Sequence, residues 1–345
     1  MGIENSVTCS DIVVTGDRPT GPLHLGHYVG SLTTRLQLQH ICRQFILIAD
    51  MQALTDYSGT PERVADHVVE VALDYLSVGI DSERSTIALQ SDIPELAELT
   101  MLFLNLVTVA RLERNPTIRD EIRQRGFIRD IPAGFLMYPV SQAADIAGFR
   151  ATVIPVGADQ LPMIEQTNEI ARAVNRLANR TVLAEARPLL SATQRLPGLD
   201  GKSKMSKSLG NTINLTASSA EIRERVNRMY TDPGHQRVED PGSVEGHAVF
   251  SYLDAFDPDR AEVERLKAHY RKGGLADSVL KQRLARLLEE LLAPIRDRRA
   301  ALASRKREVA EILDAGTKAA RVQVARVLDE VRDVFKVRRA IRCTG

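Results

Sequence analysis

The sequence alternates short apolar segments with longer amphipathic ones, and this alternation constrains the fold more than any other feature. Amphipathic segments at residues 27–41 and 61–80 follow the first two apolar segments, and Gly79 is placed to end the second of these helices. Strands that alternate with helices of this length indicate parallel βαβ units. We therefore expect an α/β fold with a Rossmann-like, doubly wound parallel sheet. The expected strand segments are residues 11–16 (DIVVTG), 44–55 (QFILIADMQALT), 85–91 (STIALQS) and 151–157 (ATVIPVG).

The rest of the chain has a mainly helical pattern. Residues 93–150 are too many for a plain crossover between strands and indicate a helical insertion. Helix is expected from residue 161 through Arg187, followed by a loop rich in glycine, lysine and serine at 196–211. From about residue 216 the pattern is again helical. We therefore divide the chain into a Rossmann-like domain of residues 1–215 and an all-helical domain of residues 216–345.

Charge is unevenly distributed, although the net charge is only +1. From residue 261 to the end there are 21 lysines and arginines against 12 acidic residues, whereas the first 260 residues carry 25 against 33. A basic C-terminal third on an acidic body suggests a polyanion as partner. Charged residues on solvent-exposed helix faces would explain the uneven charge equally well, and both interpretations stay open at this point.

Cysteine spacing and hydropathy exclude several classes of protein. Cys9, Cys42 and Cys343 are scattered without CxxC spacing, which argues against a disulfide framework and against a thiolate metal site. We expect a reducing, cytoplasmic location. The longest apolar runs are too short to cross a bilayer, so no membrane association is expected.

A glycine-rich turn, TGDRPTGPLHLGHYVGSL, follows the first expected strand. A strand, a turn and a helix N-terminus together form an anion site, because free main-chain N–H groups and the helix dipole both favour negative charge. His24 and His27 are spaced to face one ligand, and Gly26 leaves room for a flat group against its backbone. A surface or helix-capping pair of histidines is the alternative interpretation.

A second candidate, KSKMSKS at residues 202–208, lies in the later loop. Lysines on a loop can neutralise a triphosphate and a leaving pyrophosphate without covalent chemistry. Alone, this segment is as well explained by a solvated, flexible loop.

Together the two segments are far more specific. HLGH after the first strand and KMSKS after the last resemble the two signature sequences of class I aminoacyl-tRNA synthetases, and the whole chain is similar to their tyrosyl/tryptophanyl group. The resemblance implies ATP-dependent activation of an amino acid, with Mg²⁺ accompanying the phosphates, and transfer to tRNA. It also implies an anticodon-binding role for the C-terminal helices and a homodimer formed through the insertion around residues 111–149.

The resemblance also assigns roles to individual residues. The catalytic side chains would be His24, His27, Lys204 and Lys207, which stabilise charge on the phosphates. Contacts to ATP fall on Thr15, Gly16, Arg18, Gly26, Gly157, Asp159, Lys204, Met205, Ser206 and Lys207. The amino acid would be held by Val14, Tyr138, Gln142, Asp145 and Gln160. No protein-held metal is implied.

Tryptophan or tyrosine is the harder choice. Tyr138, Gln142 and Asp145 fall on one helical face, and Gln142 resembles the tyrosyl pattern. However, Val14 stands where the tyrosyl group usually has a second phenol partner, and an indole N–H needs only one acceptor. The segments PVGADQLPMIEQT and GDRPTGPLHLGHYVGSL also resemble the tryptophanyl layout. We therefore expect tryptophan and tRNA(Trp) as substrates.

Other interpretations stay open. A tyrosyl enzyme is the first alternative, and a non-catalytic synthetase-like binding protein or another nucleotidyltransferase is less favoured. Asp17 and Arg18 depart from the common form of the family. Arg18 either reaches the α-phosphate or the substrate carboxylate, or forms a turn-stabilising ion pair with Asp17.

Overall fold

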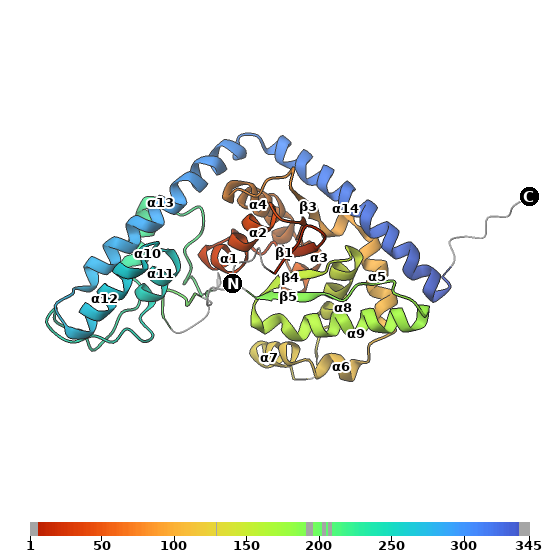
Figure 1. Ribbon diagram of the computed structural model, residues 1–345, viewed down its shortest axis with the longest axis horizontal. Coiled ribbons are helices and arrows are strands. Elements are labelled where there is room, and N and C mark those ends of the chain that lie inside the picture. The colour runs from red at the N-terminus through yellow and green to blue at the C-terminus, as the bar shows by residue number, and fades with distance from the viewer. Residues whose placement is uncertain (1–5, 129, 191–195, 202–204, 206–208, 338–345) are drawn as a thin grey trace, which may run out of the picture.

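The structure is a computed structural model that describes residues 6–128, 130–190, 196–201, 205 and 209–337. Within these residues, five parallel strands form one sheet in the order β3-β2-β1-β4-β5 (Figure 1). This order reverses direction between β1 and β4, as in a doubly wound fold. The strands are β1 (Ile12–Asp17), β2 (Arg43–Ile48), β3 (Ser85–Leu89), β4 (Val153–Val156) and β5 (Arg187–Leu190).

The four expected strands and the two expected helices are confirmed, together with the helical insertion, but the second strand segment, expected at 44–55, ends at Ile48 and helix begins at Asp50. Gly79 ends the second helix in the left-handed conformation, with φ 115°. The first half of the chain contains α1 (Leu25–His27), a π-helical turn η2 (Tyr28–Leu32), α2 (Thr33–Leu38), α3 (Asp50–Tyr57) and α4 (Glu62–Val78). The insertion contains η3 (Gln90–Asp92), α5 (Pro94–Leu104), α6 (Val109–Glu113), α7 (Pro116–Arg125) and α8 (Ala133–Gly148).

The expected helix from 161 through Arg187 is wrong in its second half. After η4 (Ala158–Gln160), helix α9 (Leu161–Ala178) ends because Asn179 adopts the left-handed conformation, with φ 51°. The chain then extends and forms β5, which among the described strands pairs with β4 alone. Its sequence gives a weak signal because this edge strand is short, largely exposed and contains Pro188.

The second half contains α10 (Ser219–Asn227), α11 (Ala248–Phe256), α12 (Arg260–Lys272), α13 (Asp277–Ala303) and α14 (Lys306–Phe335). The expectation of nearly continuous helix beyond residue 216 is wrong for residues 228–247, which form loops and turns. Two prolines, Pro233 and Pro241, interrupt this stretch, where regular helical hydrogen bonding is not sustained. None of the described helices is long and apolar enough to cross a membrane.

Alternating side chains of β2 bury both faces of the sheet. Ile46 and Ile48 point into a core shared with α4 and with the C-terminal helices α10, α11 and α13. Phe45 and Leu47 point into the opposite core, which the insertion helices, α9 and α14 complete. The continuous apolar character of this strand is therefore explained by burial on both faces.

Helix α14 returns from the helical half of the chain to the sheet. In Figure 1, α13 and α14 form a bent arch, with α10 to α12 under one arm and the sheet under the other. Ala320, Val324 and Leu328 of α14 are buried in the same core as Phe45 and Phe103. The division after residue 215 thus stays a prediction about function, because in its packing α14 belongs with the sheet.

Ion pairs between the two halves account for part of the charge asymmetry. On α13, Arg299 Nε lies 2.8 Å from Asp74 Oδ1 of α4. On α14, Arg321 and Arg332 pair with Glu95 and Glu98 of α5 at 2.9 and 2.6 Å. These cations of the basic third are neutralised by the acidic body, so the surplus available to an external polyanion is smaller than the sequence indicated.

The closest approach of α14 to the sheet yields a prediction about stability. A Cβ added to Gly316 would lie 2.1 Å from the carbonyl oxygen of Ile87 in β3. Gly316→Ala must therefore push α14 away from the strand, and we expect a loss of about 1–3 kcal/mol in the free energy of unfolding, measured by urea denaturation. Gly134→Ala in α8 is the matched control. No atom lies within 4 Å of a Cβ added there, so stability should be unchanged or slightly raised. Equal effects of the two substitutions would contradict the packing described here.

Candidate active site

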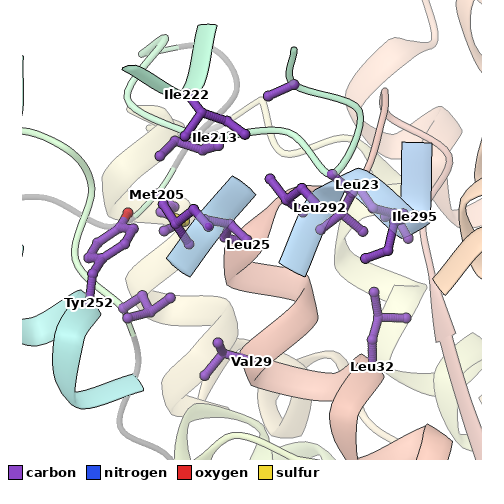
Figure 2. Close-up of a cluster of buried hydrophobic side chains, with 14 of the residues drawn as sticks. Leu23, Leu25, Val29, Leu32, Met205, Ile213, Ile222, Tyr252, Leu292 and Ile295 are labelled. Atoms are coloured by element: carbon purple, nitrogen blue, oxygen red, sulfur yellow. The ribbon is translucent and has the colours of Figure 1, made fainter. Parts of the chain in front are cut away.

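The first signature segment lies against the chain that follows the second, although the two are far apart in the sequence. Leu25 N–H donates to the carbonyl of Ile213 at 2.9 Å, and Leu215 N–H donates to the carbonyl of Leu23 at 3.0 Å. Met205 is buried in the same core as Leu25 and Tyr252 (Figure 2). Lys204, Ser206 and Lys207 lie outside the described residues, so their predicted roles have no structural description.

The two histidines have a defined hydrogen-bond arrangement at the start of α1. His24 Nδ1 accepts the main-chain N–H of Gly26, and His27 Nδ1 accepts the main-chain N–H of His24, both at 3.1 Å. His24 therefore caps α1, and together with Met205 it fills the space beside Gly26. Because Nδ1 accepts in each ring, a neutral imidazole carries its proton on Nε2 and can donate from there.

A cavity of about 430 Å³ opens at the carboxyl ends of β1 and β4, where the strand order reverses. Ligands of doubly wound sheets bind at this position. The predicted residues that line the cavity are Val14, Thr15, Gly16, Arg18, His27, Tyr138, Gln142, Asp145, Gly157 and Gln160. The other described candidates, His24, Gly26, Asp159 and Met205, do not line it.

The alternative ion pair between Asp17 and Arg18 is wrong. Arg18 Nη1 lies 2.7 Å from Asp56 Oδ2 of α3, and Asp56 also pairs with Arg125 of α7. The Asp17 carboxylate points elsewhere, to Arg35 Nη1 at 2.7 Å and the Tyr75 hydroxyl at 2.8 Å. Arg18 is 43% exposed and borders the cavity, so it remains available to an anionic ligand.

Arg35 is a buried cation directly behind the first turn. Its Nε donates to Thr15 Oγ1 at 3.1 Å, and a second nitrogen donates to the carbonyl of Gly16 at 3.3 Å. Burial alone would raise the pKa of Asp17, but the adjacent Arg35 guanidinium holds that pKa well below its ordinary value. The carboxylate and guanidinium are therefore both charged at neutral pH, and together they fix the end of β1.

Asp145 is a buried acceptor deep in the cavity wall. Gln52 Nε2 of α3 donates to Asp145 Oδ2 at 2.6 Å, and Gln90 Nε2 donates to both carboxylate oxygens at 2.9 Å. Burial raises the pKa of Asp145 to about 7, while the Gln90 amide acts to lower it and Asp50 to raise it. A group of this kind changes charge within the working pH range.

The cavity has both polar and apolar walls, and the polar side includes further residues of α8. Tyr138 donates its hydroxyl to Glu121 Oε2 at 3.2 Å, so this tyrosine is held by α7. Gln142 has no hydrogen-bond partner within the described part of the chain and is available to a ligand. On the opposite side, Val14 is buried and apolar. Tyr138, Gln142 and Asp145 share one face of α8, as the sequence spacing predicts.

Several cavity residues were not found from the sequence. Arg35, Gln52, Gln90 and Glu121 are brought to the site or beneath it by tertiary packing. A signal existed for Gln52, because it follows the carboxyl end of β2, next to the turn after β1. The same signal existed for Gln90 at the carboxyl end of β3, whereas no comparable pattern marked Arg35.

The chain is similar to proteins of one family over nearly its whole length. Residues 10–293 match the family described as tRNA synthetases class I (W and Y). A tryptophan–tRNA ligase from Clostridium longisporum is 54% identical over 331 residues, which are 95% of this chain and 97% of the relative. One from Streptococcus pyogenes serotype M3 is 51% identical over 333 residues, 94% and 98% of the two chains.

A solved structure agrees in fold. The tryptophanyl-tRNA synthetase of Campylobacter jejuni, complexed with ADP and tryptophan, superposes with a TM-score of 0.81 at 29% identity. The match covers 94% of this chain and all of that one.

The buried ion pair behind the turn yields a second prediction. Arg35→Met removes the cation but leaves the Asp17 charge buried, so the free energy of unfolding should fall by about 3–5 kcal/mol. Arg84→Met is the control, because Arg84 is 53% exposed and its pair with Asp81 is on the surface; its effect should stay below about 1 kcal/mol. Urea denaturation of both variants measures the difference. Equal decreases in the free energy of unfolding would show that the buried pair stabilises the fold no more than the surface pair.

Proposed function

The chain belongs to the class I tRNA synthetases for tryptophan and tyrosine, and from this membership we propose that its cavity joins tryptophan to tRNA(Trp) with ATP. It is an aminoacyl-tRNA ligase, and tryptophan rather than tyrosine is its amino acid, as for the relatives that share half of its residues. The tyrosyl and non-catalytic alternatives are set aside by these matches. The observation that carries the proposal at the site is one buried carboxylate, Asp145, in a cavity that His27 of the first signature segment also lines.

The first reaction needs no protein nucleophile. A carboxylate oxygen of tryptophan attacks the α-phosphorus of ATP, the bond from that phosphorus to the bridging oxygen breaks, and pyrophosphate leaves with its electron pair. Charge on the phosphoryl oxygens is greatest in the transition state, so groups that donate to them there accelerate the step. We assign this role to Nε2–H of His24 and His27 and to the ammonium groups of Lys204 and Lys207.

The second reaction transfers the activated amino acid. The 2′-hydroxyl of the terminal adenosine of tRNA attacks the tryptophanyl carbonyl, the bond to the phosphate oxygen breaks, and AMP leaves while the hydroxyl proton is released. Catalysis in both steps consists of positioning and charge stabilisation. Gly16 and Gly157 line the cavity and are assigned to ATP, as is Gly26 beside it.

The amino acid pocket is assigned to the opposite end of the cavity. Asp145 accepts the indole N–H, and Val14 provides part of an apolar slot for the ring. Tyr138, Gln142 and Gln160 lie along the same cavity and are assigned to the ammonium and carboxylate of tryptophan.

Magnesium is expected with the phosphates of ATP. In the ranges that the structure describes, no group of three or more histidine, cysteine or acidic side chains is placed to hold a metal ion. The nearest carboxylate to the turn, Asp17, is already committed to Arg35. The donor set therefore fits an ion that arrives bound to ATP, keeping water and phosphate oxygens as ligands, and it neutralises phosphate charge when bound.

We assign tRNA binding to the helical half and dimer formation to the insertion. Arg265 on α12 and Arg286 on α13 are exposed and favour a nucleic-acid contact there, although each also pairs with a glutamate of its own helix. Large apolar side chains of the insertion are exposed, with Met101 65% and Val109 59% accessible, which favours a second copy of the chain as partner.

A cytoplasmic location is proposed because the substrates are there and the thiols of Cys9 and Cys42 are free.

Pyrophosphate exchange tests the reaction. Only tryptophan among the twenty amino acids should support exchange. His27→Ala should lower its rate by on the order of 10²-fold with little change in tryptophan affinity, and Lys204→Ala should act in the same direction. His40→Ala is the matched control, because His40 is exposed and away from the cavity. Unaltered exchange in His27→Ala would contradict its catalytic role.

Selectivity tests the pocket. Asp145→Ala should abolish the preference for tryptophan over phenylalanine, because a buried acceptor left without a donor rejects the wrong ligand by on the order of 10⁴-fold. Affinity for ATP should be kept. Selectivity that survives the substitution would assign recognition of the indole to another group.

Sedimentation tests the dimer. The protein should sediment as a dimer at micromolar concentration, and Met101→Glu should shift it toward the monomer by placing a charge in the interface. Val322→Glu on α14 is the control, since Val322 is 56% exposed but outside the insertion. A monomer in the unaltered protein would reject the proposed interface.

A further inference from the structure

We propose that Gln90 is a positioning residue for tryptophan selection, which holds the Asp145 carboxylate so that one lone pair of Oδ1 faces the indole N–H. This inference rests on the proposed function and deepens it. Gln90 lies at the end of β3 and is only 2% exposed. Its place in the site comes from three hydrogen bonds that fix its orientation.

The orientation of the Gln90 amide is determined by the main chain of α3. The N–H of Gln52 donates to Gln90 Oε1 at 3.2 Å. A main-chain N–H can only donate, so the oxygen of the amide must face α3 and its nitrogen must face Asp145. Gln90 Nε2 then donates to both Asp145 oxygens at 2.9 Å. The network therefore presents Asp145 as an acceptor.

A second donor to Asp145 leaves one lone pair of its carboxylate open to a ligand. Gln52 Nε2 donates to Asp145 Oδ2 at 2.6 Å. With the Gln90 contact, both lone pairs of Oδ2 are engaged, whereas Oδ1 has one contact and one lone pair free. The indole N–H, a pure donor, matches this remaining acceptor.

The same arrangement disfavours a phenol. A phenolic oxygen can donate to Oδ1 but also needs a donor for its own lone pairs when it is buried. The amide donors of Gln52 and Gln90 are already directed at Asp145, so neither serves a phenolic oxygen. The indole N–H of tryptophan needs no such donor.

Helix α14 supports the residue before Gln90. The main-chain N–H of Leu89 donates to Thr317 Oγ1 at 3.0 Å, and the Thr317 hydroxyl donates to the carbonyl of Leu313. The junction between β3 and η3 is thus held on both sides, by α3 within the cavity and by α14 behind the sheet.

Other charged groups surround the carboxylate. Asp50 on α3 acts on Asp145 through its charge, in the direction that favours protonation. The titratable or charged side chains that line the same cavity are Asp17, Arg18, His27, Arg35, Glu121 and Tyr138. Two variants that change the protonation of Asp145 in different ways therefore distinguish its effect on the pH dependence from the effects of these other groups.

The test compares Gln90→Leu and Gln90→Glu by tryptophan-dependent pyrophosphate exchange between pH 6 and 9. In the unaltered protein, KM for tryptophan should fall as pH rises through about 7, because Asp145 ionises there. Gln90→Leu removes donors to the carboxylate, so this fall should move to higher pH, and KM at pH 7 should rise on the order of 10- to 100-fold. Gln90→Glu should keep a low KM while the two carboxyls share a proton, and KM should rise as that proton is lost. KM for ATP should stay within about twofold in both variants.

Two further variants separate positioning from a general structural effect. Gln52→Leu removes one donor to Oδ2 and should shift the profile in the same direction as Gln90→Leu, by less. Gln39→Leu is the matched control, because this buried glutamine holds Gly79 and Asp81 away from the cavity; it should lower stability without moving the pH profile. Binding can be followed by the fluorescence of tryptophan itself, since the chain contains none.

The outcomes are distinct. The inference is supported if KM for tryptophan falls with rising pH in Gln90→Leu and rises with pH in Gln90→Glu. Profiles that coincide with that of the unaltered protein, or that change equally in Gln39→Leu, overturn it even where Asp145→Ala abolishes selectivity. An unaltered protein without tryptophan-dependent exchange overturns the proposed function instead, and the inference with it.

Discussion

The buried guanidinium of Arg35 is the constraint on which the site depends. It lies in the interior, where a charge is tolerated only with a partner and filled hydrogen bonds. Asp17, Thr15 and Gly16 supply these from the end of β1, and the Tyr75 hydroxyl completes the partners of Asp17 from α4. The turn that carries the first signature therefore starts from a fixed position. Gly16 is required there as well, because a Cβ would lie 2.4 Å from the carbonyl oxygen of Leu47 in β2.

The parallel sheet could be predicted because β1, β2, β3 and β4 carry a strong local signal. Strands buried on both faces are continuously apolar, and the helices between them have a clear period. Strand β5 could not be found in this way, since Arg187 and Leu190 are exposed and one neighbour is enough to hold the strand. The loops at 228–247 were missed because neighbouring helical patterns were extended across them.

The site was predictable to the extent that it lies on contiguous motifs. His27, Gly157 and the α8 residues Tyr138, Gln142 and Asp145 line one cavity, as expected. The partners of Asp145 were out of reach because they come from the ends of two other strands and meet only in the folded protein. Likewise, the pairing of Arg18 with Asp56 depends on where α3 lies, so adjacency to Asp17 in the sequence was misleading. Short-range spacing identifies which side chains share a face, but packing decides what they contact.

The return of α14 to the sheet has a consequence for biosynthesis. Leu89 and Thr317, which are joined by a hydrogen bond in the folded protein, are 228 residues apart. At about 5–20 residues per second, a ribosome needs on the order of 10–50 s to make that interval. During this time the face of the sheet that contains Phe45 and Leu47 lacks the apolar side chains of α14. The nascent chain therefore carries an incompletely covered apolar face, and the interval before its closure is when it is most exposed to aggregation and to chaperones.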